Sequence, residues 1–270
     1  MDLSFKTLEL TISDGVADLR LNRPDRANSL NQDLWDDLRD AARALDAAPE
    51  ARIVVLSGAG KHFCAGIDLE MLGQLRPAEL EPGRAAEELR VRIMALQDCI
   101  TAFEKCRKPV LAAISGACVG AGLDLAAACD LRYASADAKF ILKEVDLGLA
   151  ADVGVLQRLP RIVGEGVTRE LAYTARTVSG EEAEQLRLVN RCYPSPDELR
   201  KGVFELAAEL AAKSPIAMRG TKHAITYARD HTVADGLDQI ATWNASALTT
   251  IDIAEAVAAF QQKRPSTFVD

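Results

Sequence analysis

Alternation of apolar and polar residues opens the chain. Residues 5–12 alternate, Asp14-Gly15 supplies a turn, and residues 16–21 alternate again. Period-two alternation on both sides of a short turn is typical of two paired strands with one buried face. The sequence therefore predicts an N-terminal β-hairpin.

A helical period replaces the alternation after the polar loop 22–28. Ser29, with Gln32 three positions later, predicts a capping box at the start of the helix. Apolar residues then recur at spacings of three and four, as expected for one buried helix face. These residues are Leu34, Leu38, Ala41 and Leu45.

Two continuous apolar runs, 51–57 and 109–115, predict strands that are buried on both faces. Each run leads into a segment dense in glycine and alanine, 58–69 and 116–123. The second of these is expected to open a helix near Leu123. Short strands are predicted at 131–134 and 138–142.

Most of the remaining chain shows a helical pattern. Residues 73–88 carry two prolines and many charges and are predicted to form a surface excursion, with a helix resuming at Arg90. Further helices are predicted at 166–174, 180–187, 196–213, 215–229, 232–248 and 252–262. Pro194 and Pro196 mark the point where mixed structure gives way to helices only, so we place a candidate boundary near residue 195.

Composition narrows the class of protein. With 270 residues and 49% hydrophobic content, the chain can bury a full core, and a net charge of −8 argues against nucleic acid as a partner. The six cysteines form no CxxC pair and indicate free thiols in a reducing compartment. No targeting signal and no membrane span is visible, so we expect a cytoplasmic protein that does not bind a membrane.

The two small-residue segments have two readings. Glycine turns that open a helix let backbone N–H groups approach a ligand, and two such turns can polarise one carbonyl oxygen. The alternative is that the glycines serve only close packing. The segment GACVGAG lacks the spacing of a dinucleotide-binding fingerprint, and neither segment ends in the Gly-Lys-Ser/Thr of a phosphate loop.

Three carboxylates stand in core-like sequence between residues 114 and 164. Asp124 follows the glycine turn, Glu144 follows an apolar run, and Asp152 interrupts one. Burying an unpaired carboxylate is costly, so each needs a reason. The alternatives are that Asp124 only complements a helix dipole and that Glu144 pairs with Lys143 or Arg158 on the surface. A solvated role is also the simpler reading of His62.

Several motifs together resemble the enoyl-CoA hydratase/isomerase (crotonase) superfamily over essentially the whole chain. They are LNRP and NSL near the N-terminus, HFCAGIDL in the first small-residue segment, GACVGAG in the second, and FQQKRP in the tail. Within the superfamily the chain is most similar to the Δ3,5-Δ2,4-dienoyl-CoA isomerases, since the spacing of Asp124, Glu144 and Asp152 matches theirs. Ordinary hydratases usually have glycine where Asp152 stands.

The resemblance implies an α/β fold, a crotonase-like spiral of ββα units over residues 1–195. Residues 196–270 would then be a helical trimerisation region, and the protein a homo-oligomer, either a trimer or a hexamer. The implied oxyanion hole consists of the backbone amides of Ile67 and Ala121, which bind the oxygen of an acyl-CoA thioester. The other substrate-binding positions implied are Ala65, Gly66, Asp68, Leu69, Gly122 and Phe260, together with Ile67 itself.

The implied reaction is the isomerisation of 3,5-dienoyl-CoA to 2,4-dienoyl-CoA in fatty acid β-oxidation. Glu144 would take a proton from C2, Asp152 would deliver one at C6, and Asp124 would orient or tune the pair. Apolar neighbours of Asp152 are expected to raise its pKa and keep it protonated. These neighbours are Leu147, Leu149, Val153 and Leu156. No cofactor is expected, because coenzyme A is part of the substrate.

Two rival functions stay open. A 2-enoyl-CoA hydratase would use Asp124 and Glu144 to activate a water molecule. A non-catalytic acyl-CoA-binding member would keep the fold without turnover.

Overall fold

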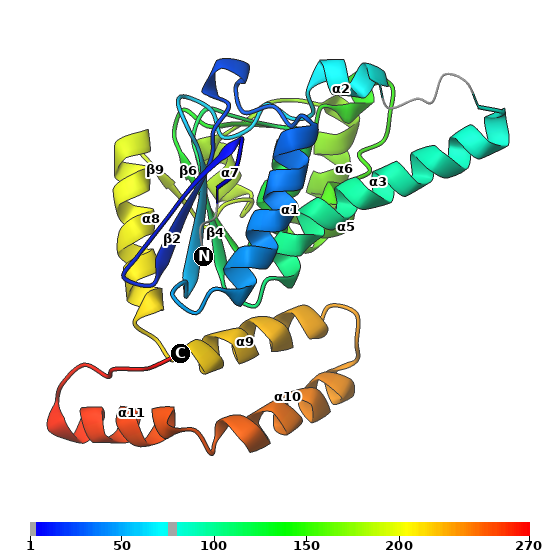
Figure 1. The fold of residues 1–270 in the computed structure, drawn as a ribbon. Helices are drawn as coiled ribbons and strands as arrows, with labels where there is room; N and C mark the ends of the chain where they lie inside the picture. Colours follow the sequence, from blue (N-terminus) through cyan, green and yellow to red (C-terminus); the bar gives the residue numbers. More distant parts are fainter. Residues whose placement is uncertain (1–3, 75–79) are drawn as a thin grey trace.

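A six-stranded sheet forms the centre of the molecule in the computed structural model, which describes residues 4–74 and 80–270 (Figure 1). The first two strands form the predicted antiparallel hairpin, and every later neighbour pairs in parallel. In sheet order the strands are β1 (Leu8–Ser13), β2 (Val16–Leu21), β3 (Ile53–Gly58), β4 (Val110–Ile114), β6 (Leu131–Ser135) and β9 (Arg191–Tyr193).

Helices cover both faces of this sheet. Alternate residues of β3 point to opposite sides: Val54 and Leu56 pack in the core that includes α1 (Gln32–Ala47), α3 (Pro82–Lys105) and α4 (Ala121–Ala128). Ile53 and Val55 pack in the core that includes α8 (Pro196–Ala211). This double coverage explains why the apolar runs of the parallel strands are continuous.

A second, three-stranded sheet lies at the carboxyl end of β4. It consists of β5 (Ala117–Val119), β7 (Lys139–Ile141) and β8 (Val178–Ser179). Short helices connect the strands of the two sheets along the chain. They are η1 (Pro24–Arg26), α2 (Leu69–Gln74), η2 (Glu144–Leu147), α5 (Val155–Val163), α6 (Glu165–Thr174) and α7 (Gly180–Gln185).

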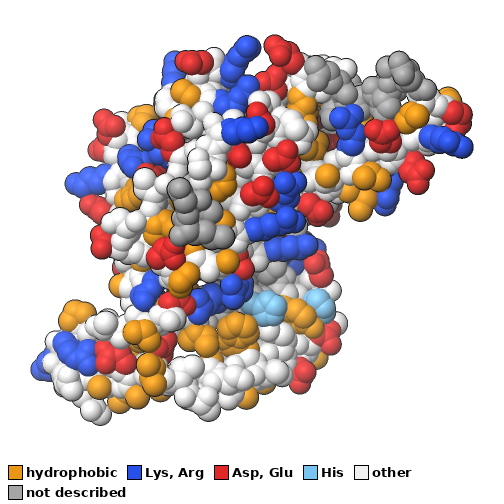
Figure 2. All heavy atoms as spheres, in the orientation of Figure 1, with side chains coloured by type: hydrophobic (Ala, Val, Ile, Leu, Met, Phe, Trp, Pro, Cys, Tyr) orange, Lys and Arg blue, Asp and Glu red, His pale blue; other side chains and the backbone are white. Residues whose placement is uncertain are grey.

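Three C-terminal helices form a layer below this body (Figure 1). They are α9 (Pro215–Tyr227), α10 (Val233–Ala247) and α11 (Ile251–Gln262). Apolar side chains, orange in Figure 2, are visible on this layer. Val233, Ile251 and Phe260 of these helices are exposed. The division of the chain at residue 195 stays a prediction. Helix α8, just beyond it, packs on the sheet.

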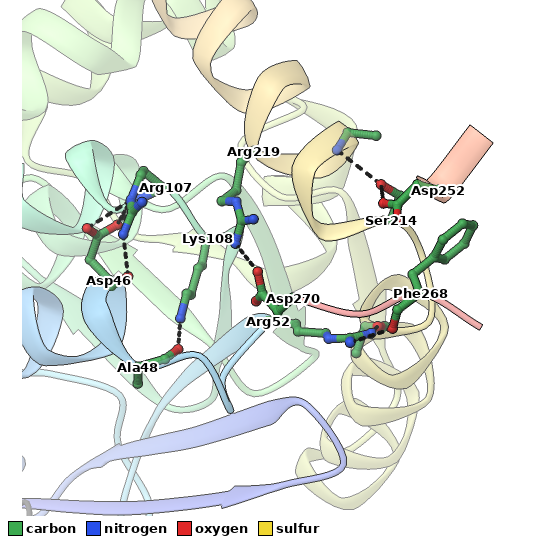
Figure 3. A network of polar contacts seen from close by, with 12 residues as sticks. Asp46, Ala48, Arg52, Arg107, Lys108, Ser214, Arg219, Asp252, Phe268 and Asp270 are labelled. Atoms are coloured by element: carbon green, nitrogen blue, oxygen red, sulfur yellow. Dashed lines mark hydrogen bonds and ion pairs between the residues drawn. The ribbon is translucent and has the colours of Figure 1, made fainter. Parts of the chain in front are cut away.

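Polar contacts return the C-terminal tail to the body (Figure 3). Arg219 of α9 pairs with Asp270 at 2.5 Å, and Arg52, just before β3, donates to the carbonyl of Phe268 at 2.7 Å. Arg52 also donates to the carbonyl of Ala211 at the end of α8. The tail thereby joins the helical layer to the central sheet.

Local predictions failed where a tertiary contact replaced a sequence pattern. The side chain of Asn31, rather than Ser29, caps α1 by accepting from the amide of Leu34, and Ser29 lies against Asp68. Helix α3 begins at Pro82, inside the predicted surface excursion, and residues 75–79 of that excursion lie outside the described residues.

Pairing with β7 makes a strand, β5, out of part of the predicted turn, so α4 starts at Ala121 rather than near Leu123. Helix α5 and the short strands β8 and β9 were not predicted. In the described part of the chain, no helix is long and apolar enough to cross a bilayer.

Candidate active site

A short parallel bridge clamps the two small-residue segments together. The amide of Cys64 donates to the carbonyl of Ala117 at 2.9 Å, and the amide of Val119 donates to the carbonyl of Cys64 at 3.0 Å. A side chain at Gly122 would approach the Cys64 carbonyl to 2.6 Å. The packing explanation is therefore correct for Gly122, and this close contact also brings the ends of the two segments side by side.

The amides of Ile67 and Ala121 lie at these ends. Both residues line one cavity of about 660 Å³. Among hydrogen bonds between described residues, neither amide donates to a protein acceptor. Ala121 is the first residue of α4 and has negative φ, so alanine meets no backbone strain there, and the positive end of the helix dipole faces the cavity.

Apolar side chains from distant parts of the chain complete the cavity. Trp35 comes from α1, Leu72 from α2, and Ile93 and Leu96 from α3. Leu147 and Leu149 close the opposite side, and they are partly exposed, at 47% and 36%. Such a lining suits a hydrocarbon chain, because it removes apolar surface from water.

Asp124 lies beneath this cavity, in the first turn of α4. Its side chain is fully buried, and one oxygen accepts the amide of Val155 at 2.5 Å. The other oxygen has no hydrogen-bond partner among the described residues. Burial and the nearby Glu144 charge raise the pKa of Asp124 to about 8, against an ordinary value of 3.8. Asp124 is therefore protonated at neutral pH.

Glu144 follows β7 and lies against the backbone of Gly120, the residue before Ala121. One carboxylate oxygen would be only 3.0 Å from a side chain at Gly120, and the other is buried without a partner among the described residues. Burial and the charge of Asp152 raise the pKa of Glu144. The alternative of surface pairing is wrong for Glu144, since Lys143 pairs with Asp146 and Arg158 with Glu104.

Asp152 lines the same cavity from the loop before α5. Burial raises the pKa of Asp152, in the expected direction, although its side chain is accessible to solvent. The nearby apolar wall is less complete than predicted, because Leu147 and Leu149 are partly exposed. The acid held most firmly in its neutral form is Asp124 rather than Asp152.

Some of the other predicted substrate-binding residues line the cavity and some do not. Ala65, Gly66, Asp68 and Leu69 line the cavity, where Asp68 pairs with Arg23 at 3.1 Å. Two predicted substrate contacts lie elsewhere. Gly122 packs against Cys64, and Phe260 is 85% exposed on α11 and does not line the cavity within this chain.

His62 has a structural contact. Its Nδ1 accepts the amide of Ala117 at 3.1 Å, which ties the two small-residue segments together. The simpler interpretation of His62 as a solvated side chain did not include this bond, and its lack of a catalytic role stays a prediction. Three residues that were not predicted as site residues also line the cavity: Gly120, Arg26 and Lys143. Arg26 and Lys143 become neighbours of one cavity only in the fold, so no local pattern marked them.

Comparisons with known proteins find relatives over nearly the whole chain. Residues 11–270 match the family model described as enoyl-CoA hydratase/isomerase. The chain is 46% identical to a peroxisomal Δ(3,5)-Δ(2,4)-dienoyl-CoA isomerase of Arabidopsis thaliana, with 98% of each covered. It is 43% identical to a mitochondrial enzyme of that name from Rattus norvegicus, with 98% of this chain and 82% of that protein covered.

Solved structures show the same architecture. An enoyl-CoA hydratase from Bacillus anthracis superposes with a TM-score of 0.89 at 32% identity, covering 98% of this chain and 99% of that one. The match spans the central sheet and the helical layer alike.

Proposed function

Because the chain belongs to the enoyl-CoA hydratase/isomerase family, we propose that it is an enzyme that converts 3,5-dienoyl-CoA into 2,4-dienoyl-CoA during fatty acid oxidation. The predicted family and the crotonase-like α/β fold are confirmed. The observation that carries the activity is that Glu144 and Asp152 line one cavity together with the amides of Ile67 and Ala121.

The two amides supply the electrostatic part of the reaction. Removal of a proton from C2 places negative charge on the thioester oxygen, and N–H donors fixed at that oxygen stabilise it without reorganising. Loss of one donor of this kind typically costs about 2.7–4 kcal/mol in the transition state. The amides of Ile67 and Ala121 have no competing protein acceptor among the described residues, so they are ready to bind the oxygen.

The two carboxyl groups move the protons. Glu144, ionised, takes a proton from C2, and the electron pair shifts along the diene to form double bonds at C2 and C4. Asp152, protonated, delivers a proton to C6. The raised pKa of Asp152 favours its protonated form, which suits a proton donor. The raised pKa of Glu144 makes its carboxylate a stronger base. Which acid acts at which carbon is part of the proposal.

Asp124 tunes this pair rather than transferring a proton to substrate. It is neutral at pH 7 and close enough for the charges of Glu144 and Asp152 to affect its pKa. A neutral Asp124 allows Glu144 to be ionised, because it places no second negative charge beside it. The proposed chemistry needs no metal or redox cofactor, and coenzyme A enters as part of the substrate.

A homo-oligomer, either a trimer or a hexamer, stays a proposal. Support comes from the apolar side chains exposed on the helical layer, including Val233, Ile251 and Phe260. Phe260 and Lys263 would then approach coenzyme A from a neighbouring subunit. A cytoplasmic location also stays a prediction, while the names of the relatives place those proteins in peroxisomes and mitochondria.

The test is incubation with a 3,5-dienoyl-CoA while recording the ultraviolet band of the conjugated 2,4-dienoyl thioester. The band should grow with the wild-type protein, and Asp152→Asn should abolish it while acyl-CoA binding stays near normal. Unchanged turnover in Asp152→Asn would sink the assignment of Asp152. Hydration of crotonyl-CoA without isomerisation would favour a 2-enoyl-CoA hydratase, and binding without turnover would favour a non-catalytic member.

A further inference from the structure

Asp152 borders two cavities. Besides the apolar cavity that holds the oxyanion hole, it lines a second one of about 740 Å³ between α3, α4, α5 and α9. Of the three acids, Asp152 alone lines this second cavity. The carbonyl of Asp152 accepts a hydrogen bond of 2.6 Å from Gln97, which also lines it.

The second cavity is polar. Arg158 donates to Glu104 at 2.7 Å and to Thr101 at 3.1 Å. Arg161 pairs with Asp230 at 2.9 Å at the same cavity. A space of this size lined by charged groups holds many water molecules, since one water takes about 30 Å³. Asp152 thus has hydrocarbon on one side and a hydrated, charged space on the other.

The cavity on the far side of Glu144 differs in character. It has about 710 Å³ and borders Glu144 and Leu149. Most of its other lining residues are apolar, among them Leu142, Val145, Ala150, Ala151, Leu156, Pro160 and Ala172. Both cavities are lined partly by charged groups, with more of them beyond Asp152 than beyond Glu144, where Glu165 and Arg169 lie.

The proposed reaction requires both acids to recover their starting protonation states after each turnover. After each turnover Glu144 carries the proton from C2, and Asp152 is ionised because its proton now forms the new C–H bond at C6. Before the next turnover Asp152 must gain one proton and Glu144 must lose one. Direct transfer between the two acids and exchange of each with solvent both satisfy this balance.

We propose that the polar cavity beyond Asp152 is the solvent route by which Asp152 regains its proton. This inference rests on the proposed isomerase function. Water in this cavity donates a proton to the Asp152 carboxylate, and Glu144 releases the proton taken from C2 to water in the other cavity that it borders, where Glu165 and Arg169 also lie. Glu104 does not store the proton, because the Arg158 guanidinium bound to it helps to hold its pKa below the ordinary value. The hydrogen added at C6 therefore comes from solvent.

The experiment uses 3,5-octadienoyl-CoA with deuterium at both C2 positions, in ordinary water. The 2,4-product is analysed by mass spectrometry and NMR after less than one-tenth conversion, and the remaining substrate is checked for retained deuterium. We expect hydrogen at C6 in most product molecules. Deuterium at C6 in nearly all of them would overturn the inference, since it would show direct return from C2. Absence of any 2,4-product would instead refute the proposed function.

Variants of the cavity link the result to this route. Ala127 of α4 lines the polar cavity, and Ala127→Leu fills part of it with hydrocarbon, whereas Ala127→Ser keeps it open. We expect Ala127→Leu to lower kcat several-fold and to raise the fraction of C6 deuterium, with KM unchanged, and Ala127→Ser to match the wild type.

A surface position provides a second pair of variants that does not depend on core packing. Gln157 of α5 is exposed and lines the same cavity, so Gln157→Trp should narrow it and Gln157→Ala should not. Gln157→Trp should raise the fraction of product with deuterium at C6, as Ala127→Leu does. Wild-type label distribution in both Ala127→Leu and Gln157→Trp, with each variant folded by circular dichroism, would refute the assignment of this cavity.

Discussion

Replacement of Gly120 by alanine tests how the backbone positions both the oxyanion hole and Glu144. Gly120 has φ of 51° and ψ of −121°, a conformation that side chains rarely adopt, and its strain costs about 1–3 kcal/mol for a residue with Cβ. The added Cβ would lie 3.0 Å from a Glu144 carboxylate oxygen, so that carboxylate must move by a few tenths of an ångström. The amide of Ala121, the next residue, moves with the same turn.

We expect Gly120→Ala to lower the free energy of unfolding by about 1–3 kcal/mol and kcat by about 10- to 100-fold, because misplacement by 1 Å can cost about 10² in rate. The measurements are urea unfolding and the ultraviolet assay with a 3,5-dienoyl-CoA.

Gly164→Ala is the matched control. Gly164 has φ of 83° and nothing within 4 Å of an added Cβ, and it does not line the cavity. It should show a similar loss of stability with nearly normal kcat. Equal kcat in Gly120→Ala and Gly164→Ala would refute the reasoning that Gly120 positions the site.

Three further predictions follow from single contacts. Asp124→Asn keeps the acceptor for the amide of Val155 and mimics the neutral acid, so it should retain most activity at pH 7. Between about pH 4 and pH 8 native Asp124 holds a proton that the unfolded chain has released, so its contribution to the free energy of unfolding falls as pH rises. Asp124→Asn should remove this part of the pH dependence, measured by urea unfolding at stepped pH. An unchanged pH dependence would contradict the assignment. Glu144→Gln should stop exchange of the C2 hydrogen with D₂O, seen by NMR, whereas Asp152→Asn should still exchange it; the reverse pattern would swap their roles. Asn28 is fully buried and makes three hydrogen bonds, so Asn28→Ala should cost about 3 kcal/mol of unfolding free energy, and a loss below about 1 kcal/mol would mean that these bonds are replaced.

Short-range patterns predicted most elements of the fold. The hairpin, the buried strands and the C-terminal helices follow from period and from continuous apolar runs, because those patterns report which faces are buried. The start of α1 was misjudged, since both Ser29 and Asn31 are good caps and only the contact of Ser29 with Asp68 decides between them. Strand β5 was missed because its partner β7 lies 20 residues away in the chain.

The three acids and the two small-residue segments could be identified from the sequence, with the family motifs giving them roles. Only the tertiary structure decided how the acids differ. Asp124 is neutral because it is fully buried under α5, Glu144 lies against Gly120, and Asp152 stands between an apolar and a polar cavity. Segments that meet only in the fold decide how far each carboxyl group is exposed to water, which charges lie near it and which cavity it faces. The sequence determined which groups are present, and the packing of α3, α4, α5 and α9 around them determined their protonation and their access to water.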